Sequence, residues 1–415
     1  MTTPLAARLE SPRRRFTFRG NTRETRHGWL RLTPAYSVHF VRELLESHAA
    51  EDGAVLDPFC GTGTTLLACA ERGLDAATID LNPFLVWLAR TKTARYSATA
   101  LDEAAALVES MGAAARARSG ESFVPPIHRV ERWWSAPVLG GLGRAAARLH
   151  AGSKGAPKAA RDLARVAFCR AIIETANVSF GHQSMSFKEP PSDVSGGAAR
   201  VARALAAAFD GLRPSAETAL PRSTLRVHEG DSRAVDAVMG EARFALVVTS
   251  PPYSNRMSYI RELRPYMYWL GHLAAKSDAG ELDWRAIGGT WGAATSRLAT
   301  WKADAKVRVP FDGFGRIVRG IADTEPLLGS YVHRYFEDMV LHARGLFEVV
   351  QPGGKLQYVV GNSKFYDVML PAQEIFAAIF EDAGFTNAVV TTVRKRTSKR
   401  ELYEYLVEAR RPSRR

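Results

Sequence analysis

A glycine-rich loop lies between a short apolar run and a helical run near the start of the chain. Residues 54–57 read as a strand, residues 58–65 as the loop Pro-Phe-Cys-Gly-Thr-Gly-Thr-Thr, and the next residues as a helix that Gly73 ends. A second strand, 76–79, leads to Asp80, about 20 positions beyond the loop. This βαβ unit predicts the nucleoside-binding half of a doubly wound α/β fold.

The residues of this unit indicate the kind of ligand. Gly61 and Gly63 let the backbone approach a ligand closely, and the loop has neither Gly-x-Gly-x-x-Gly nor Gly-Lys-Ser/Thr spacing, which favours a ligand without phosphates. Asp80 is placed to accept hydrogen bonds from ribose hydroxyls. Asp231 and Ser232, at the end of the third expected strand, suit an adenine amino group. The alternative is a plain glycine turn with ordinary strand-end aspartates.

A second motif follows the apolar run 244–248, which reads as a buried strand. The run ends in Ser250, Pro251, Pro252 and Tyr253. The prolines fix their own backbone angles and keep the preceding serine out of helical space. Hydrogen-bond acceptors beside a tyrosine face suit a flat heterocycle that carries an amino group. The alternative is a polar turn that caps a strand.

These motifs together resemble the amino-group DNA methyltransferases, which modify cytosine at N4 or adenine at N6 with S-adenosylmethionine. The glycine loop, Asp80, the Gly-Asp-Ser at 230–232 and the Ser-Pro-Pro-Tyr at 250–253 carry the resemblance, which covers the α/β core but neither of two insertions. Residues 36–40 resemble the family's N-terminal cofactor motif. The resemblance implies a doubly wound, Rossmann-like class I methyltransferase sheet and S-adenosylmethionine as cofactor.

The matching motifs imply a set of site residues. The residues expected at the cofactor are Ser37, His39, Asp57, Pro58, Phe59, Gly61, Gly63, Thr64, Asp80, Leu81, Asn82, Asp231 and Ser232. The expected catalytic residues are Ser250, Pro251, Pro252 and Tyr253. Ser250 and the Pro251 carbonyl would draw a delocalised exocyclic amine toward tetrahedral geometry, while Tyr253 stacks on a base flipped out of the duplex. Most of the remaining rate acceleration comes from holding the amine close to the methyl donor, and the reaction uses no metal and no covalent intermediate.

The serine at the first catalytic position favours cytosine N4 as the target. In the family, adenine enzymes more often carry aspartate or asparagine there, so adenine N6 is the alternative. Methylation at ring carbon five needs a nucleophilic cysteine after a proline, and none of Cys60, Cys69 and Cys169 follows one. Their spacing also argues against a zinc site and a disulfide framework. An RNA base-amine methyltransferase and a non-catalytic nucleic-acid-binding module are further alternatives.

The amino-acid composition indicates which kind of partner the protein binds. The net charge of +13 favours a polyanion, either nucleic acid or an anionic membrane, although a generally basic proteome is an alternative source of this charge. No apolar stretch approaches the roughly 20 residues that cross a bilayer. We therefore expect a cytoplasmic, nucleoid-associated prokaryotic protein that acts on double-stranded DNA, without metal or membrane, and with a restriction endonuclease as a possible partner.

The chain divides by composition and periodicity into a core and additions to it. We expect a flexible basic arm at 1–26, a catalytic core at 27–97, 222–254 and 330–409, a mainly helical insertion at 98–221, a second insertion at 255–329 and a basic tail at 410–415. The helical insertion is the candidate for target recognition, and the second insertion is a candidate DNA contact. The basic side chains expected at the nucleic acid are Lys188, Arg256, Arg264, Lys395 and Arg396.

Overall fold

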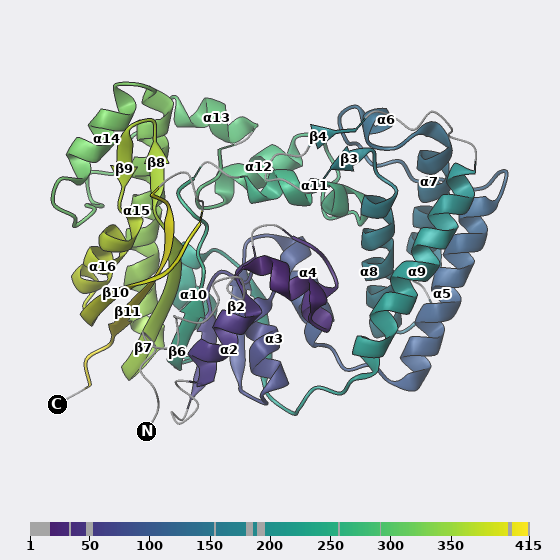
Figure 1. The fold of residues 1–415 in the computed structure, drawn as a ribbon, viewed down its shortest axis with the longest axis horizontal. Coiled ribbons are helices and arrows are strands. Elements are labelled where there is room, and N and C mark those ends of the chain that lie inside the picture. Colours follow the sequence, from purple (N-terminus) through teal and green to yellow (C-terminus); the bar gives the residue numbers. More distant parts are fainter. Residues whose placement is uncertain are drawn as a thin grey trace.

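A seven-stranded sheet carries helices on both faces, and a helical bundle extends from one side of it (Figure 1). The computed structural model describes residues 17–32, 35–46, 53–152, 155–179, 186–188, 196–255, 258–290, 292–396 and 401–413. Within these ranges no helix combines the length and the apolar character that crossing a membrane requires.

The central sheet is mostly parallel. Its strands, in spatial order, are β10 (Thr386–Lys395), β11 (Tyr403–Arg410), β7 (Val350–Gly361), β6 (Phe244–Thr249), β1 (Ala54–Asp57), β2 (Ala76–Asp80) and β5 (Leu225–Glu229). The five strands from β7 to β5 run parallel, and β11 is antiparallel to both of its neighbours. The chain order reverses between β1 and β6, which makes this a doubly wound sheet. The predicted class I methyltransferase fold is confirmed.

Alternate side chains of the parallel strands pack on opposite faces of the sheet. Val55 of β1 belongs to the apolar cluster on one face, and its neighbour Leu56 belongs to the cluster on the other. The first face is covered by α2 (Val38–Glu46), α3 (Thr64–Glu71) and α4 (Pro83–Thr93), and the second by α10 (Val235–Met239), α15 (Pro326–Val349) and α16 (Ala372–Asp382). Every residue of β6 is buried, as the continuous apolar run predicts for a strand covered on both faces.

Between α4 and β5 the chain leaves the sheet and forms the bundle at the right of Figure 1. Its elements are α5 (Ala98–Arg116), α6 (Val130–Trp133), α7 (Ala136–Ala151), α8 (Lys158–Glu174), the ribbon of β3 (Val178–Ser179) and β4 (Ser186–Phe187), and α9 (Gly197–Glu217). The rings of Trp134 and Phe168 lie with centroids 5.5 and 5.7 Å from that of Trp269. Trp269 lies after the Ser-Pro-Pro-Tyr turn in sequence, so the bundle is packed against the segment that leaves this turn.

Further helices follow the turn. They are α11 (Tyr259–Trp269), α12 (Asp278–Arg285), α13 (Ala293–Leu298) and α14 (Phe314–Ala322), and a ribbon of β8 (Ser363–Phe365) and β9 (Val368–Leu370) follows β7. Helix α15 (Pro326–Val349) begins at a proline. The Glu325 side chain accepts a hydrogen bond from the Leu327 N–H, and proline suits the first helical position. A long helix therefore leads into β7.

The segment before the sheet differs from the predicted flexible arm. Residues 1–16 lie outside the described residues, but residues 18–23 and 26–28 form the short 3₁₀ turns η1 and η2. Arg26 is only 2% exposed. Its guanidinium donates hydrogen bonds to the carbonyl oxygens of Lys92 and Ala94 at the end of α4, and of Ser215, Ala216 and Thr218 around the end of α9. Burial with these acceptors explains why this part of the arm is ordered.

Candidate active site

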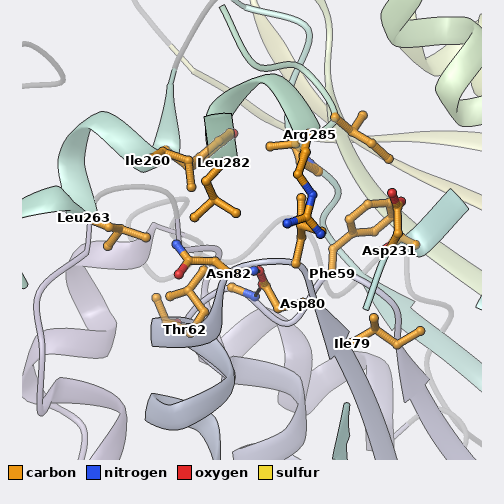
Figure 2. Close-up of a pocket in the computed structure, with 18 of the residues that line it drawn as sticks. Phe59, Thr62, Ile79, Asp80, Asn82, Asp231, Ile260, Leu263, Leu282 and Arg285 are labelled. Atoms are coloured by element: carbon orange, nitrogen blue, oxygen red, sulfur yellow. Dashed lines mark hydrogen bonds between the residues drawn. The ribbon is translucent and has the colours of Figure 1, made fainter. Parts of the chain in front are cut away.

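A pocket lies at the carboxyl ends of the parallel strands, against helices α11 and α12 (Figure 2). Its volume is about 880 Å³, part of which is open to solvent. The residues that line it are Leu32, Phe59, Gly61, Thr62, Ile79, Asp80, Leu81, Asn82, Leu85, Asp231, Ser232, Pro252, Tyr259, Ile260, Leu263, Leu282, Arg285, Ala286 and Ile287. Open α/β sheets bind ligands here, outside the strand ends where the chain order reverses.

The glycine loop between β1 and α3 borders this pocket. Gly61 and Gly63 have φ angles of +50° and +74°, in the region that glycine occupies without strain. A Cβ atom on Gly63 would come within 3.2 Å of the Cβ atom of Ala89 in α4, whereas one on Gly61 would meet nothing closer than 3.8 Å. The backbone conformation favours glycine at both positions, and the close approach of a helix adds to this preference at Gly63.

Two charged side chains hold this loop. The Oδ2 atom of Asp80 accepts a hydrogen bond from the Gly61 N–H at 2.9 Å, and its Oδ1 atom accepts one from the Asn82 N–H at 2.8 Å. The buried Lys92 ammonium donates to the Thr62 carbonyl oxygen at 3.0 Å. Burial raises the pKa of Asp80 to about 7. Its carboxylate lines the pocket and has further lone pairs for a ligand donor.

Asp231 is the second carboxylate of the pocket, and Arg233 orients it. The Nη2 atom of Arg233 lies 2.6 Å from Oδ2 of Asp231, while its Nη1 atom contacts Asp338 at 3.0 Å. Partial burial alone would raise the pKa of Asp231, but the bonds from Arg233 outweigh burial and lower it. Arg233 also donates to the Arg285 carbonyl oxygen at 2.8 Å. One guanidinium thus joins the strand end to the end of α12, above the pocket.

Ser232 is fixed by a buried histidine. The Nδ1 atom of His342 lies 2.7 Å from the Ser232 carbonyl oxygen, and its Nε2 atom lies 2.7 Å from the Tyr358 hydroxyl. Burial lowers the pKa of His342 to about 4, so the ring is neutral, with Nδ1–H donating and Nε2 accepting. The Ser232 hydroxyl donates to the Pro58 carbonyl oxygen, and Phe59 packs edge-on against His342. The third strand end and the glycine loop are therefore locked together.

The Ser-Pro-Pro-Tyr turn leaves β6 directly after Thr249. The Thr249 hydroxyl donates to Oδ1 of Asp57 at 2.6 Å, and the same oxygen accepts from the Phe59 N–H at 3.1 Å. Asp57 is 2% exposed, and burial raises its pKa to about 7. Asp57 therefore ties the start of the glycine loop to the end of β6, and it does not line the pocket.

The turn is held by residues from distant segments. The carbonyl oxygen of Pro252, which lines the pocket, accepts a hydrogen bond from the Tyr335 hydroxyl at 2.6 Å. The Tyr253 N–H donates to the Tyr259 hydroxyl at 3.2 Å. The Tyr253 ring packs on Gly361 at the end of β7, where an added Cβ atom would lie 2.9 Å from the ring. The Tyr253 ring can therefore take this position only because residue 361 is a glycine and has no side chain.

The chemistry of the lining fits a nucleoside without phosphates. Two carboxylates, Asp80 and Asp231, repel phosphate and accept hydrogen bonds from hydroxyl and amino groups. Apolar side chains, among them Phe59, Ile79 and Ile287, suit a flat ring. S-adenosylmethionine has these groups. Among the described residues, no group of three or more His, Cys, Asp or Glu side chains is arranged to hold a metal ion.

Sequence comparison places the first part of the chain in a family. The family model described as DNA methylase, which covers N6- and N4-directed enzymes, matches residues 16–90, the segment that contains the glycine loop and Asp80. This segment belongs to the amino-group DNA methyltransferases. The methyltransferase family uses S-adenosylmethionine, in agreement with the lining of the pocket.

Two curated methyltransferases match a short segment of the chain. Type II methyltransferase M.BsoBI of Geobacillus stearothermophilus is 32% identical over 72 residues, which are 17% of this chain and 14% of the relative. Type II methyltransferase M.MjaII of Methanocaldococcus jannaschii is 35% identical over 65 residues, or 15% and 12% of the two chains. The matched segment therefore spans only a small part of each relative's length.

A solved structure aligns over a longer stretch with a weaker resemblance. TrmN from Thermus thermophilus is 11% identical, and the alignment covers 99% of this chain and 54% of that one with a TM-score of 0.32. The assignment of the fold rests on the strand order and directions of the methyltransferase sheet, not on this overlap.

The structure brings together about half of the predicted cofactor residues. Those that line the pocket are Phe59, Gly61, Asp80, Leu81, Asn82, Asp231 and Ser232. Those that do not line it are Ser37, His39, Asp57, Pro58, Gly63 and Thr64. Ser37 is buried, and His39 lies 3.5 Å from Glu24. A direct cofactor contact of the second group stays a prediction.

The predicted nucleic-acid contacts occupy different surroundings. The Arg264 guanidinium lies 5.2 Å from the centroid of the Trp133 ring, and burial lowers its pKa to about 10. Arg396 lies 5.2 Å from the centroid of the Tyr253 ring. Lys188 and Lys395 are exposed, and Arg256 lies outside the described residues. Their contacts with nucleic acid stay predictions.

One wall of the pocket comes from two helices beyond the Ser-Pro-Pro-Tyr turn. Leu282, Arg285 and Ile287 come from α12 and the residues after it, inside the segment assigned to the second insertion. Ile260 and Leu263 come from α11. The i, i+3 spacing of these two apolar residues just beyond the turn is a usable signal for an inward face. For α12 we find no such signal, because only folding brings it to the pocket.

Proposed function

We propose that the protein transfers a methyl group from S-adenosylmethionine to an exocyclic amine of a DNA base, namely N4 of cytosine. The observation that carries the proposal is the position of Pro252. It belongs to the Ser-Pro-Pro-Tyr turn and borders the same pocket as Phe59, Gly61 and Asp80. A methyl donor held on the glycine loop would therefore lie next to the turn that receives the base.

The pocket residues have separate roles in this proposal. Asp80 would accept hydrogen bonds from the ribose hydroxyls, and Asp231 one from the adenine amino group. When bound, S-adenosylmethionine supplies an electrophilic methyl group on a sulfonium. The apolar side chains of α11 and α12 would exclude water from the reacting groups.

The turn would activate the amine. The hydroxyl oxygen of Ser250 and the carbonyl oxygen of Pro251 are acceptors for the two amine hydrogens, and they would shift the nitrogen lone pair out of conjugation. Tyr253 would stack on the base. The surplus proton of the methylated nitrogen would pass to solvent water, so no strong base is needed and proximity provides most of the acceleration.

Residue type and the family match support the proposed target base and polymer. Serine at position 250 supports cytosine N4, with adenine N6 as the second candidate. The match to a DNA methylase family supports DNA over RNA. Both relatives are named type II methyltransferases, which supports the proposal that this protein acts together with a restriction endonuclease.

The deciding experiment is incubation of the protein with S-adenosylmethionine and either duplex DNA or RNA, followed by mass spectrometry of the nucleosides. We expect N4-methylcytosine in DNA. N6-methyladenine in DNA would overturn the choice of base and leave the reaction intact. A product in RNA alone would overturn the DNA assignment, and no product with either polymer would favour a binding module.

A further inference from the structure

An aromatic side chain and a guanidinium lie stacked at the surface of the helical bundle. Phe187, at the end of β4, is 41% exposed, and its ring meets Trp133 edge-on at a centroid distance of 5.6 Å. The guanidinium carbon of Arg132 lies 4.2 Å from the centroid of the Phe187 ring. A single exposed phenylalanine is ordinary, but one that carries an arginine on its face is an organised feature.

Arg132 differs from other arginines in its surroundings. Arg26 and Arg233 donate to carbonyls and carboxylates, whereas within the described part of the chain no hydrogen bond or ion pair engages the Arg132 side chain. Stacking restricts the guanidinium while its five N–H donors stay available. An arginine in this state loses less conformational entropy when it binds a planar acceptor pair or a phosphate.

The stacked pair is connected to the pocket through α11. Trp133, against which Phe187 packs, carries the Arg264 guanidinium 5.2 Å from its ring centroid. Leu263, the residue before Arg264, lines the pocket. Figure 1 shows α6, β3 and β4 along the same upper edge of the molecule as α11 and α12. A duplex whose target base enters the pocket would have its neighbouring nucleotides near this edge.

The charges around the pair favour a polyanion. Lys188 follows Phe187 and is exposed, and Arg129, also exposed, precedes α6 with a φ angle of +51°. A left-handed backbone conformation costs free energy at a residue other than glycine. At Arg129 this conformation sets the direction in which the chain enters α6. Glu131 is an exposed acid within the same turn, so the surface is mixed but predominantly basic.

We infer that Arg132, positioned by Phe187, contacts the DNA substrate beside the flipped base. This inference rests on the proposed function, and it assigns part of target binding to the bundle. The guanidinium would donate either to a base edge in the major groove or to a phosphate. Both groups accept hydrogen bonds from a guanidinium. Loss of a contact to a base edge would relax the sequence preference, whereas loss of a contact to a phosphate would weaken binding to all sequences alike.

The test compares variants of the full chain on duplex DNA. Arg132→Ala removes the guanidinium, Arg132→Lys keeps the charge without the planar fork, and Phe187→Ala removes the support. Arg203→Ala, at an exposed position of α9, is the matched control. The measurements are kcat, the KM for DNA, the KM for S-adenosylmethionine, and DNA affinity at several salt concentrations. Circular dichroism and thermal melting check that each variant folds.

We expect Arg132→Ala to raise the KM for DNA by roughly 5- to 100-fold, the loss associated with one specific arginine contact, with the KM for S-adenosylmethionine unchanged. Relaxed sequence preference would identify a base edge. A uniform loss with a salt slope smaller by about one would identify a phosphate. A KM for DNA within twofold of the Arg203→Ala control would overturn the inference. If the wild-type protein methylates no DNA, the proposed function itself fails.

Discussion

The hydroxyl of Tyr335 donates a 2.6 Å hydrogen bond to the carbonyl oxygen of Pro252. The same peptide group is bonded on its other side, because the Tyr253 N–H donates to the Tyr259 hydroxyl at 3.2 Å. Tyr335 belongs to α15 and Tyr259 to α11, so one peptide plane is held between two helices. Its orientation fixes the direction of the turn in which Ser250 lies.

Replacing Tyr335 by phenylalanine removes this hydrogen bond and keeps the ring. We expect kcat to fall roughly 3- to 10-fold, since a net hydrogen bond contributes about 1 kcal/mol, with the KM for S-adenosylmethionine unchanged. Steady-state kinetics on duplex DNA measures both constants, and Tyr366→Phe, at an exposed position, serves as control. A changed KM for the methyl donor with normal kcat would show that Tyr335 supports the pocket and not the turn.

Replacing Ser250 by alanine removes one acceptor of the amine. We expect kcat to fall on the order of 10²-fold, as for the loss of one preorganised group that stabilises a transition state. Ser250 is not among the pocket residues, so the dissociation constant of S-adenosylmethionine stays the same. Single-turnover methylation and titration calorimetry separate the two quantities. Wild-type methylation by this variant would remove Ser250 from the mechanism.

Replacing Asp80 by asparagine removes a charge that burial already disfavours. The pKa of Asp80 is raised to about 7, so its carboxylate becomes protonated as the pH falls below neutrality and loses acceptor capacity. We expect the affinity of the wild-type protein for S-adenosylmethionine to fall below pH 7 by up to about tenfold per pH unit. Asp80→Asn should bind weakly with little pH dependence. Calorimetry from pH 5.5 to 8.5 checks this, with the exposed Asp102→Asn as control.

Asp57 makes stability depend on pH in the opposite sense to an ion-paired carboxylate. Burial raises its pKa from 3.8 to about 7 in the folded chain, so folding favours the protonated form. The contribution of Asp57 to the free energy of unfolding is therefore greatest below pH 4 and declines as the pH rises to about 7. Asp57→Asn should show a smaller decline between pH 4 and 7 than wild type in denaturant unfolding. Equal slopes would contradict the raised pKa.

The sequence predicted the parts of the fold that local patterns encode. The run 244–248 is apolar at every position, and the structure makes it a fully buried central strand. The glycines and Asp80 lie within one βαβ unit, so their meeting needs only local geometry. Five of the predicted cofactor residues, Phe59, Gly61, Asp80, Leu81 and Asn82, line the pocket for this reason.

The remainder depends on contacts between distant segments. No periodicity links Arg285 to Asp231, although Arg233 bonds both residues. His342 looks like any histidine in a helix until burial and the Ser232 carbonyl give it a role. Arg26 is one of many arginines near the start of the chain, and its burial follows from carbonyl groups nearly 70 and 190 positions away. Patterns within a window of residues do not contain such information.

Arg26 also joins the bundle to the sheet. The chain enters the bundle just after α4 and returns from it just after α9, and the single guanidinium bonds carbonyls at both crossings. Any rocking of the bundle against the sheet would have to pivot about this side chain or break its hydrogen bonds. Arg26, which does not line the pocket, therefore holds together the two chain crossings that connect the bundle to the sheet.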